Sequence, residues 1–421
     1  MYKFPYWLGL ACLLANPAAA QFSVATPSPA RTVADEQPLL SLPAAQALAL
    51  EKNAGIAAAG NEVKATEGAL QQAGARPNPE LAATMEDTRK STRTTTYQLN
   101  QAIELGGKRG ARMDAAERGR DAAMLELAVK RGEIRSAVTT AYFGVLGAQE
   151  RQRLAQETLK LATTAAGMAT RRVSAGKISP VEETKARVVE SSARLELNQA
   201  ASELITARKR LAALWGDNAL RYANVEGRLD GLPALPEIAD IVARVPNAPV
   251  LRLAKIEVTR RQALARVESS KRVPDLTVSL GRKRDEEARR NMWVIGVSVP
   301  LPLFDSNQGN LREALSRTDK ARDELQLAEN RLDLEVAEAY ERLRNAHQEA
   351  GALQQDILPA AQSAYDAAGK GFELGKFSFL EVLDAQRTLF QAKLQHLRAL
   401  SQGHGAAADI DHLLGDDELT K

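Results

Sequence analysis

The chain has 421 residues, of which 56 are basic and 53 acidic, and a formal net charge of +3 at pH 7. Charges this close to balance create no field that favours nucleic acid or acidic substrates, so nucleic-acid binding is disfavoured. Only 4% of the residues are aromatic, and the rest is rich in Ala, Leu, Glu, Gln and Arg. This composition is typical of long helices that pack through small side chains, and it argues against a compact enzyme domain.

The N-terminus has the features of an export signal. A basic residue precedes an apolar run at 6–15, and small residues at 17–20 form a cleavage site. We therefore expect a signal peptide at 1–20, followed by an extended segment at 21–41. Cleavage would remove Cys12, the only cysteine, and with it any disulfide. A lipid anchor on Cys12 is the alternative, and it is disfavoured because this residue lies inside the apolar run.

The chain contains two copies of one unit, which become visible when it is compared with itself at a shift of about 199 residues. Residues 173–182 run parallel to residues 372–381, and both segments contain Gly-Lys followed by Ser and Glu at the same spacing. The segment between the two copies carries Gly and Pro residues that interrupt regular structure. The predicted organisation is a first repeat at 42–216, a connector at 217–235, a second repeat at 236–415 and a tail at 416–421.

Each repeat is predicted to contain a helix, two strands and a long helical hairpin, in that order. The first helices are expected at 43–74 and 237–271. The strands show a period of two, most clearly where Trp293, Ile295 and Val297 form an apolar face. The predicted strands are 79–87, 96–105, 274–282 and 291–301, joined by charged, solvent-exposed loops at 88–94 and 282–290.

The hairpins are expected to be coiled coils. Apolar residues recur at steps of three and four through 127–173 and again through 325–367, where the later seam positions are 353, 357, 360, 364 and 367. Many of these residues are alanine, which lets helix backbones approach closely. A single helix from 107 to 173 would be about 100 Å long at 1.5 Å per residue. Pro359 is expected to kink the second hairpin.

Strands of about nine to eleven residues with one apolar face suit a bilayer, but only a closed barrel leaves no unpaired edge in lipid. Four strands cannot close a barrel, so several chains must contribute four each. Three chains giving twelve strands are the smallest assembly with a real lumen. The alternative is a small soluble sheet carried on a coiled-coil stalk.

Three segments carry a family resemblance: QAIELGGKR at 101–109, PLPLFDSNQG at 300–309 and LEVLDAQR at 380–387. In these segments the chain resembles TolC-like outer-membrane efflux proteins, most closely their CzcC-type heavy-metal branch. The resemblance implies a mainly α fold with a small β part. Long coiled-coil hairpins and four transmembrane strands per chain would assemble, in a homotrimer, into a 12-stranded outer-membrane β-barrel and a periplasmic α-helical tunnel.

The resemblance also implies a passive exit duct in the outer membrane of a Gram-negative bacterium. Such a duct works with a periplasmic membrane-fusion adaptor and an inner-membrane pump of the resistance-nodulation-division (RND) type, which supplies the energy. Divalent heavy-metal cations are the substrate that the resemblance favours. The alternatives are a channel for drugs or for type I protein secretion and, from another class, a periplasmic coiled-coil scaffold.

Both hairpins are predicted to reverse through the pattern Gly-Lys-x-Ser-x-x-Glu. Gly176 and Gly375 can take the left-handed conformation that ends a helix. Ser179 and Ser378 are each followed three residues later by Glu, which predicts two capping boxes. Good turn chemistry alone explains these residues equally well. The resemblance implies that such tips dock the adaptor, and the candidate contacts are Gly176, Lys177, Ser179, Gly375, Lys376 and Ser378.

A second candidate site lies at the start of the last helix. Asp384 has Lys185 as its counterpart in the first repeat, so the turn chemistry shared by both copies does not require it. Glu381 and Asp384 share one helix face, and in a trimer they would place six carboxylates around the tip. Rings of acidic side chains favour cations, and the resemblance implies a constriction at this stretch. We therefore hypothesise a gate with cation selectivity. The alternative is a solvated helix start stabilised by the helix dipole.

The sequence offers no convincing catalytic or metal-binding motif. Gly106-Gly107-Lys108 lacks both the earlier glycine and the following Ser or Thr of a phosphate-binding loop. His404 and His412 are eight residues apart, which does not place them as i and i+4 ligands. We expect no enzymatic activity, no cofactor and no metal site.

Overall fold

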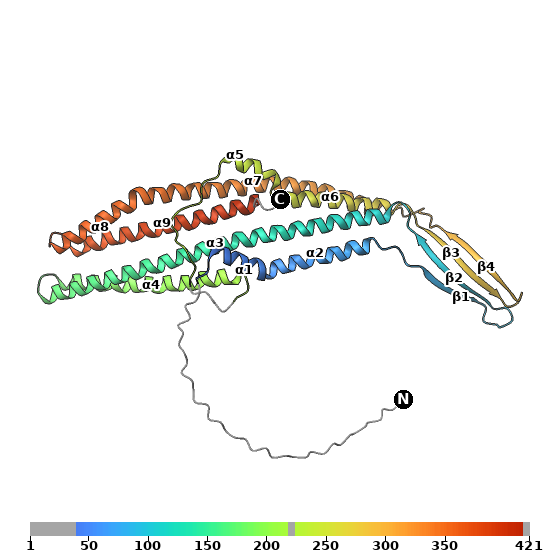
Figure 1. The fold of residues 1–421 in the computed structure, drawn as a ribbon, viewed down its shortest axis with the longest axis horizontal. Helices are drawn as coiled ribbons and strands as arrows, with labels where there is room; N and C mark the ends of the chain where they lie inside the picture. Colours follow the sequence, from blue (N-terminus) through green and yellow to red (C-terminus); the bar gives the residue numbers. More distant parts are fainter. Residues whose placement is uncertain (1–38, 218–223, 416–421) are drawn as a thin grey trace, which may run out of the picture. The chain divides into compact units, whose positions relative to one another are not determined.

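The computed structural model describes residues 39–217 and 224–415, which are mainly helical with one antiparallel sheet of four strands (Figure 1). The mainly α fold with a small β part is thereby confirmed. The expected signal peptide at 1–20, most of the segment at 21–41 and the tail at 416–421 lie outside the described residues. Within the described part of the chain, no helix has the length and apolarity needed to cross a membrane.

The same order of elements occurs twice along the chain. Residues 42–216 contain α1 (Leu42–Lys52), α2 (Ala54–Ala73), β1 (Glu80–Glu86), β2 (Thr94–Ile103), α3 (Lys108–Ser174) and α4 (Pro180–Ala213). Residues 236–415 contain α5 (Ile238–Arg244), the 3-10 turn η1 (Val245–Asn247), α6 (Pro249–Ser270), β3 (Leu276–Asp285), β4 (Arg290–Ser298), α7 (Gln308–Ala352), the π-helix η2 (Leu353–Ile357), α8 (Leu358–Glu373) and α9 (Phe379–Leu414).

The helices expected at 43–74 and 237–271 are each interrupted, so the prediction of single helices was wrong. The side-chain oxygen of Asn53 accepts hydrogen bonds from the N–H groups of Gly55 and Ile56, at 2.8 and 3.1 Å, and therefore caps α2. The amide of the same Asn53 donates to the carbonyl of Leu214, at 2.7 Å. In the second copy, prolines in η1 and at the start of α6 cannot supply the N–H that a continuous helix needs.

The sheet has the strand order β1-β2-β3-β4, and every neighbouring pair is antiparallel. The strands β2 and β3 come from different copies of the unit, so the sheet joins the two copies. β3 continues to Asp285, which pairs with Thr94 on one side and Arg290 on the other. The charged segment expected as a loop at 282–290 therefore begins as strand, because backbone pairing extends further than the apolar pattern.

The two faces of the sheet differ in chemistry. One face exposes large apolar side chains, with Trp293 and Ile295 each 76% exposed and Leu81 75% exposed. The opposite face is mostly polar or small, with Met292 and Val294 of β4 as exceptions, and there the hydroxyl of Ser279 donates to Oδ1 of Asn100, at 2.8 Å. The strands β1 and β4 form the two edges of this sheet, and the backbone groups on their outer sides find no strand partner within the described residues.

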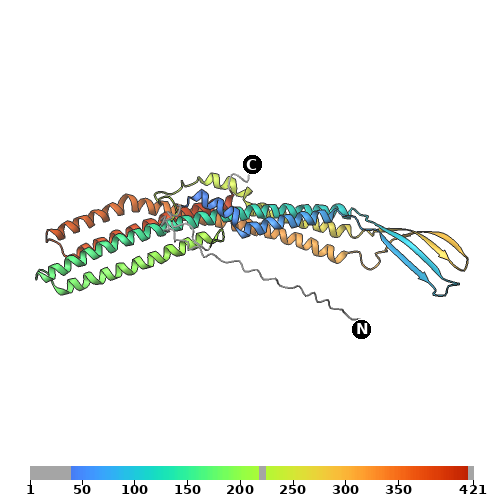
Figure 2. The same cartoon turned by 60° about the horizontal axis from the view of Figure 1, so that its bottom comes forward.

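The long helices pack as predicted through a seam of small residues. The helix α3 has 67 residues, which at 1.5 Å per residue gives about 100 Å. It pairs with α4, and α7 with η2 and α8 pairs with α9 (Figure 2). The predicted seam is confirmed in α3, where its buried members are Ile134, Val138, Val145, Ala155, Ala162, Ala166 and Ala169.

The seam of the second hairpin shifts at the π-helix η2. Pro359 follows directly after η2, and its missing N–H and bulky ring are incompatible with a regular helix at that point. A π turn contains one extra residue, which rotates all later side chains by one position. In α8 the buried side chains include Ala361 and Ala368, whereas Ile357, at the end of η2, is 44% exposed. The seam predicted at 357, 360, 364 and 367 was therefore wrong by one residue.

Candidate gate and docking sites at the hairpin tips

Both hairpins end their first helix in the same backbone motif. Gly176 and Gly375 have φ angles of 69° and 71°, which confirms the predicted left-handed conformation. The N–H of Lys177 donates to the carbonyl of Arg172 at 2.9 Å, and that of Lys376 donates to the carbonyl of Gly371 at 2.8 Å. These bonds are the six-to-one closure of a Schellman motif. An L-residue in this conformation costs roughly 1–2 kcal/mol, so glycine is the residue that the turn requires.

The second helix of each hairpin begins at a serine, but the two caps differ. The predicted capping box is confirmed at Ser378, whose N–H donates to Oε2 of Glu381 at 2.6 Å while its hydroxyl accepts from the N–H of Glu381 at 3.4 Å. At the first tip the hydroxyl of Ser179 accepts instead from the N–H of Val181, at 3.3 Å. The N–H of Glu182 donates to the backbone carbonyl of Ser179. A reciprocal box predicted there is therefore replaced by a simpler cap.

The lysines that follow the two glycines lie on the surface of the tips. Lys177 and Lys376 are both exposed. Within the part of the chain that the structure describes, neither ammonium group forms an ion pair. Each tip therefore presents an unneutralised cation beside a fixed backbone turn, a combination suited to a contact with a polar or acidic partner surface.

An interaction that sequence reasoning missed joins the two tips. The guanidinium carbon of Arg172 in α3 lies 4.1 Å from the centre of the Phe372 ring in α8, and Nη2 donates to the carbonyl of Phe372 at 3.4 Å. Beside it, Ala166, Ala169 and Ala186 form a small buried cluster against which Phe372 and other partly buried apolar side chains pack. The only signal in the sequence is that the repeat alignment places Phe372 opposite Val173, the neighbour of Arg172.

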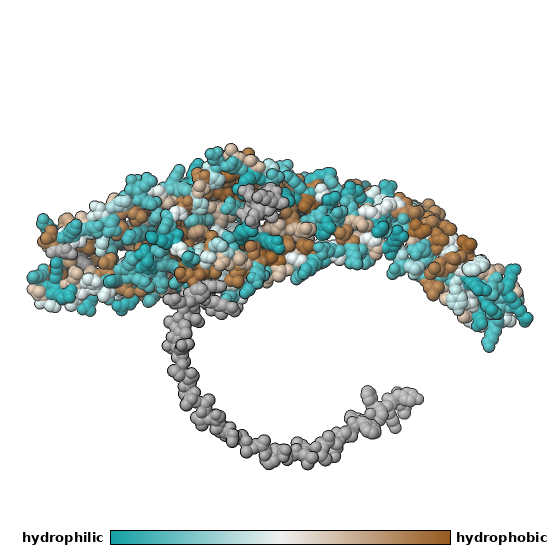
Figure 3. All heavy atoms as spheres, in the orientation of Figure 1, coloured by the Kyte–Doolittle hydropathy of each residue, from teal (hydrophilic) through white to brown (hydrophobic). Residues whose placement is uncertain are grey.

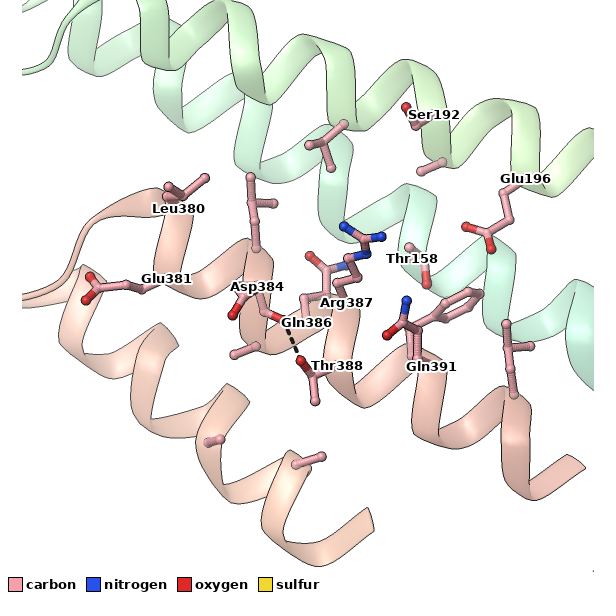
Figure 4. A pocket seen from close by; sticks show the side chains of 18 of the residues that line it. Thr158, Ser192, Glu196, Leu380, Glu381, Asp384, Gln386, Arg387, Thr388 and Gln391 are labelled. Atoms are coloured by element: carbon pink, nitrogen blue, oxygen red, sulfur yellow. Dashed lines mark hydrogen bonds between the residues drawn. The ribbon is translucent and has the colours of Figure 1, made fainter. Parts of the chain in front are cut away.

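Glu381 and Asp384 lie at the start of α9, and both are exposed on one flank of the helix (Figure 4). Their states differ, because the carboxylate of Glu381 is held by the N–H and hydroxyl of Ser378, at 2.6 and 3.1 Å. The carboxylate of Asp384 makes no hydrogen bond or ion pair within the described residues. Both predicted gate residues thus lie at the start of α9, but only the carboxylate of Glu381 is held by hydrogen bonds within the described residues.

Both carboxylates border an open groove of about 1430 Å³ between the two hairpins. Its polar lining includes Thr158, Glu196, Gln386 and Gln391, and Figure 4 shows Arg387 extending from α9 into it. Burial raises the pKa of Glu196, and the charge of Arg151 opposes that rise in part. Sequence reasoning missed Glu196 and Arg387, because the groove is formed by helices far apart in the chain.

No group of three or more potential ligands among the described residues could hold a metal ion. The imidazoles of His347 and His404 contact backbone carbonyls instead. Their Nε2 atoms lie 2.7 Å from the carbonyl of Pro233 and 2.8 Å from that of Gly231. Both histidines therefore hold the connector against α7 and α9. The hairpin tips carry exposed carboxylates, but the residues that the structure describes form no coordination sphere for a metal.

The chain is similar in sequence to known outer membrane efflux proteins. The family model described as "Outer membrane efflux protein" matches residues 46–217 and 245–416. The cobalt-zinc-cadmium resistance protein CzcC of Cupriavidus metallidurans is 48% identical over 98% of this chain and 98% of its own length. The nickel-cobalt-cadmium resistance protein NccC of Alcaligenes xylosoxydans xylosoxydans is 29% identical over 68% of this chain and 66% of its own.

Solved structures share the fold at low sequence identity. The crystal structure of CusC superposes with a TM-score of 0.76 at 19% identity, and the match covers 89% of this chain and 92% of that one. At this identity the likeness shows the fold alone. It does show that the four-stranded sheet and the long helical hairpins belong to one known architecture.

Proposed function

The chain belongs to the outer membrane efflux protein family, and we propose that it is the exit channel of a tripartite system that expels divalent heavy-metal cations. The family is one of outer-membrane efflux channels that act with an adaptor and an inner-membrane pump, and it is not a family of enzymes. In this proposal three identical chains form the channel, a periplasmic membrane-fusion adaptor docks at its tips, and an RND-type pump supplies the energy.

The observation that carries the channel is the sheet. It has four strands, an exposed apolar face and two edges unpaired within the described residues. In lipid such edges are untenable, because each unsatisfied backbone group costs several kcal/mol there. Pairing β4 of one protomer with β1 of the next satisfies both edges, and three protomers would close twelve strands. The apolar face then meets lipid, and the polar face with Ser279 and Asn100 lines the lumen.

Heavy-metal cations are proposed as substrate because CzcC and NccC are named for resistance to cobalt, cadmium, zinc and nickel. A passive duct needs no tight metal site, since a deep site would slow the exit of the ion. Growth of a deletion strain on metal salts and on antibiotics tests the assignment. Sensitivity to the metals supports it, whereas sensitivity to drugs alone would remove it in favour of a drug channel.

We propose that Glu381 and Asp384 form the cation-selective gate of the trimer. Three copies of each place six carboxylates around the periplasmic end, and acidic rings favour cations. The double variant Glu381→Ala/Asp384→Ala should lower the cation preference of the channel in planar bilayers. Glu182→Ala is the matched control, because it removes the equivalent, partly buried carboxylate from the first turn of α4 in the first hairpin. An equal change in both variants would argue against a ring at the second tip.

We further propose that the adaptor docks on the two tips through Gly176, Lys177 and Ser179 and through Gly375, Lys376 and Ser378. The support is local: each tip combines a Schellman turn with an exposed lysine that forms no ion pair within the described ranges. Lys177→Glu and Lys376→Glu should weaken capture of the purified adaptor without changing trimer formation. Lys185→Glu, a charge reversal in α4 beyond its first turn, is the control. Unchanged capture by both tip variants would place the docking surface elsewhere.

A further inference from the structure

An arginine interrupts the apolar face of the sheet at one level. Arg282 of β3 lies directly opposite Tyr97 of β2 on one side and Trp293 of β4 on the other. Both aromatic side chains are exposed, Tyr97 by 60% and Trp293 by 76%, and Arg282 is exposed as well. These three side chains therefore form one row across the sheet on its apolar face, named here the aromatic–arginine row.

The neighbouring rows give this row its depth in the membrane. The next row toward the helices is entirely apolar and consists of Leu81, Leu99, Leu280 and Ile295. Further along the same face of β3 come Val278 and then Leu276, which lies about 20 Å from Arg282 at about 3.3 Å per residue. An outward arginine is destabilising by about 2–4 kcal/mol at the bilayer midplane but by only about 0–1 kcal/mol near the interface. The aromatic–arginine row must therefore lie at the level of the lipid head groups.

The direction of the chain identifies which head groups these are. The helices leave the sheet from the ends of β2 and β4 near Ile103 and Ser298, whereas Arg282 lies toward the loops that join β1 to β2 and β3 to β4. With the helices in the periplasm, these loops face the cell exterior. Figure 3 shows the hydrophobic surface of the sheet giving way to a hydrophilic tip on this side. The row therefore meets the outer leaflet.

The charge of Arg282 is available for a ligand. Within the described part of the chain its guanidinium makes no hydrogen bond, ion pair or ring contact, in contrast to Arg284, whose Nε lies 2.6 Å from Oε1 of Glu286. The surrounding segments 86–93 and 282–290 hold eight basic and five acidic residues, so the local field is positive. A guanidinium flanked by two aromatic rings fits a phosphate group, which it can bind through two parallel N–H donors.

We propose that the aromatic–arginine row is a binding site for the phosphate groups of outer-leaflet lipid, with Arg282 as the phosphate ligand and Tyr97 and Trp293 packing against the upper acyl chains. The proposal rests on the proposed placement of the sheet in the outer membrane. Its occupant is a phosphorylated lipid, because the row is continuous with the lipid-facing apolar rows. A free phosphate ion would gain nothing from the two aromatic side chains.

Native mass spectrometry of the detergent-solubilised full-length protein tests the proposal. The probe is a bisphosphorylated glucosamine lipid (lipid A), compared with the same lipid after removal of its phosphates and with inorganic phosphate. Arg282→Gln should weaken binding of the phosphorylated lipid by about tenfold, the effect of losing a charge-assisted hydrogen bond. The dephosphorylated lipid should bind weakly to all variants, and inorganic phosphate should not compete at equal concentration.

Lys283→Gln is the matched control. Lys283 is the next residue of β3, carries the same charge and points to the opposite face, where its Nζ lies 3.7 Å from Oε2 of Glu86. It should retain lipid binding within about twofold. Equal weakening by both substitutions, or none by Arg282→Gln, would overturn the site. Conductance in a planar bilayer distinguishes a failure of the lipid site from a failure of the channel. If Arg282→Gln conducts ions and keeps full affinity for the lipid, only the lipid site is contradicted. If the unmodified protein conducts no ions, the proposed channel itself is contradicted.

Discussion

Replacement of Gly375 by alanine should loosen the second hairpin tip, whereas the same replacement at Gly369 should tighten α8. Gly375 has a φ of 71°, and a Cβ built there would meet nothing within 4 Å. The whole effect is therefore conformational and costs about 1–2 kcal/mol. A Cβ at Gly369 also meets nothing within 4 Å, but this residue is in the interior of a helix. Alanine there should stabilise the folded chain by about 0.5–1 kcal/mol.

Amide hydrogen exchange at the tip measures this difference directly. The N–H of Lys376 donates to the carbonyl of Gly371, and it exchanges when the turn opens. Gly375→Ala should raise its exchange rate about 5- to 30-fold, the factor that corresponds to one or two kcal/mol. Gly375→Asn should have a smaller effect, because asparagine enters the left-handed region more readily. The prediction is contradicted if the N–H of Lys376 exchanges at the same rate in Gly375→Ala as in Gly369→Ala.

Three further substitutions test separate contacts. Arg172→Ala removes the cation over the Phe372 ring, an interaction of about 0.5–2 kcal/mol. The distance between spin labels on the two hairpin tips should then increase. An unchanged distance would show that this contact does not hold the two tips together. Burial raises the pKa of Glu196, so the folded chain binds the carboxyl proton of Glu196 more tightly than the unfolded chain does. Protonation of Glu196 therefore adds to the free energy of unfolding at low pH, and this contribution is lost as the pH rises through the folded-state pKa. Glu196→Gln should therefore flatten the dependence of Tm on pH below neutrality, and an unchanged slope would assign that dependence to other groups. Tyr142→Phe removes the buried hydroxyl that donates to the carbonyl of Leu40 at 2.9 Å, and the denaturant midpoint should reveal a loss of about 1–2 kcal/mol; an unaltered midpoint would contradict a stabilising role for this bond.

Features that depend on a few neighbouring residues could be predicted from the sequence. The left-handed glycines and the capping box at Ser378 follow from local backbone rules, and the seam of α3 follows from the helical period. The same reasoning failed where a second local rule competed. Asn53 prefers to cap α2, and Pro359 is accommodated by a π turn that the periodicity does not contain. In both places the helical spacing of the apolar residues predicted a helix, but it did not predict where that helix is interrupted.

Contacts between distant segments could not be predicted. The stacking of Arg172 on Phe372 and the groove that contains Glu196 depend on how two hairpins sit side by side. The pattern of a single helix carries no information about that arrangement. The position of Arg282 shows the same limit. Arg282 stood at the boundary between the predicted strand 274–282 and the predicted loop 282–290, and only the strand register placed it between Tyr97 and Trp293.

The oligomeric mass in detergent, determined together with single-channel conductance in a planar bilayer, tests most directly whether this chain forms a channel. Three copies in one particle, with a stable conductance that prefers cations, are expected. Pairing of β1 and β4 between protomers would satisfy both edges of the sheet, and the proposed gate of Glu381 and Asp384 would favour cations. A single chain that stays in solution without detergent and conducts no ions would contradict the channel, and the sheet would then belong to a soluble scaffold.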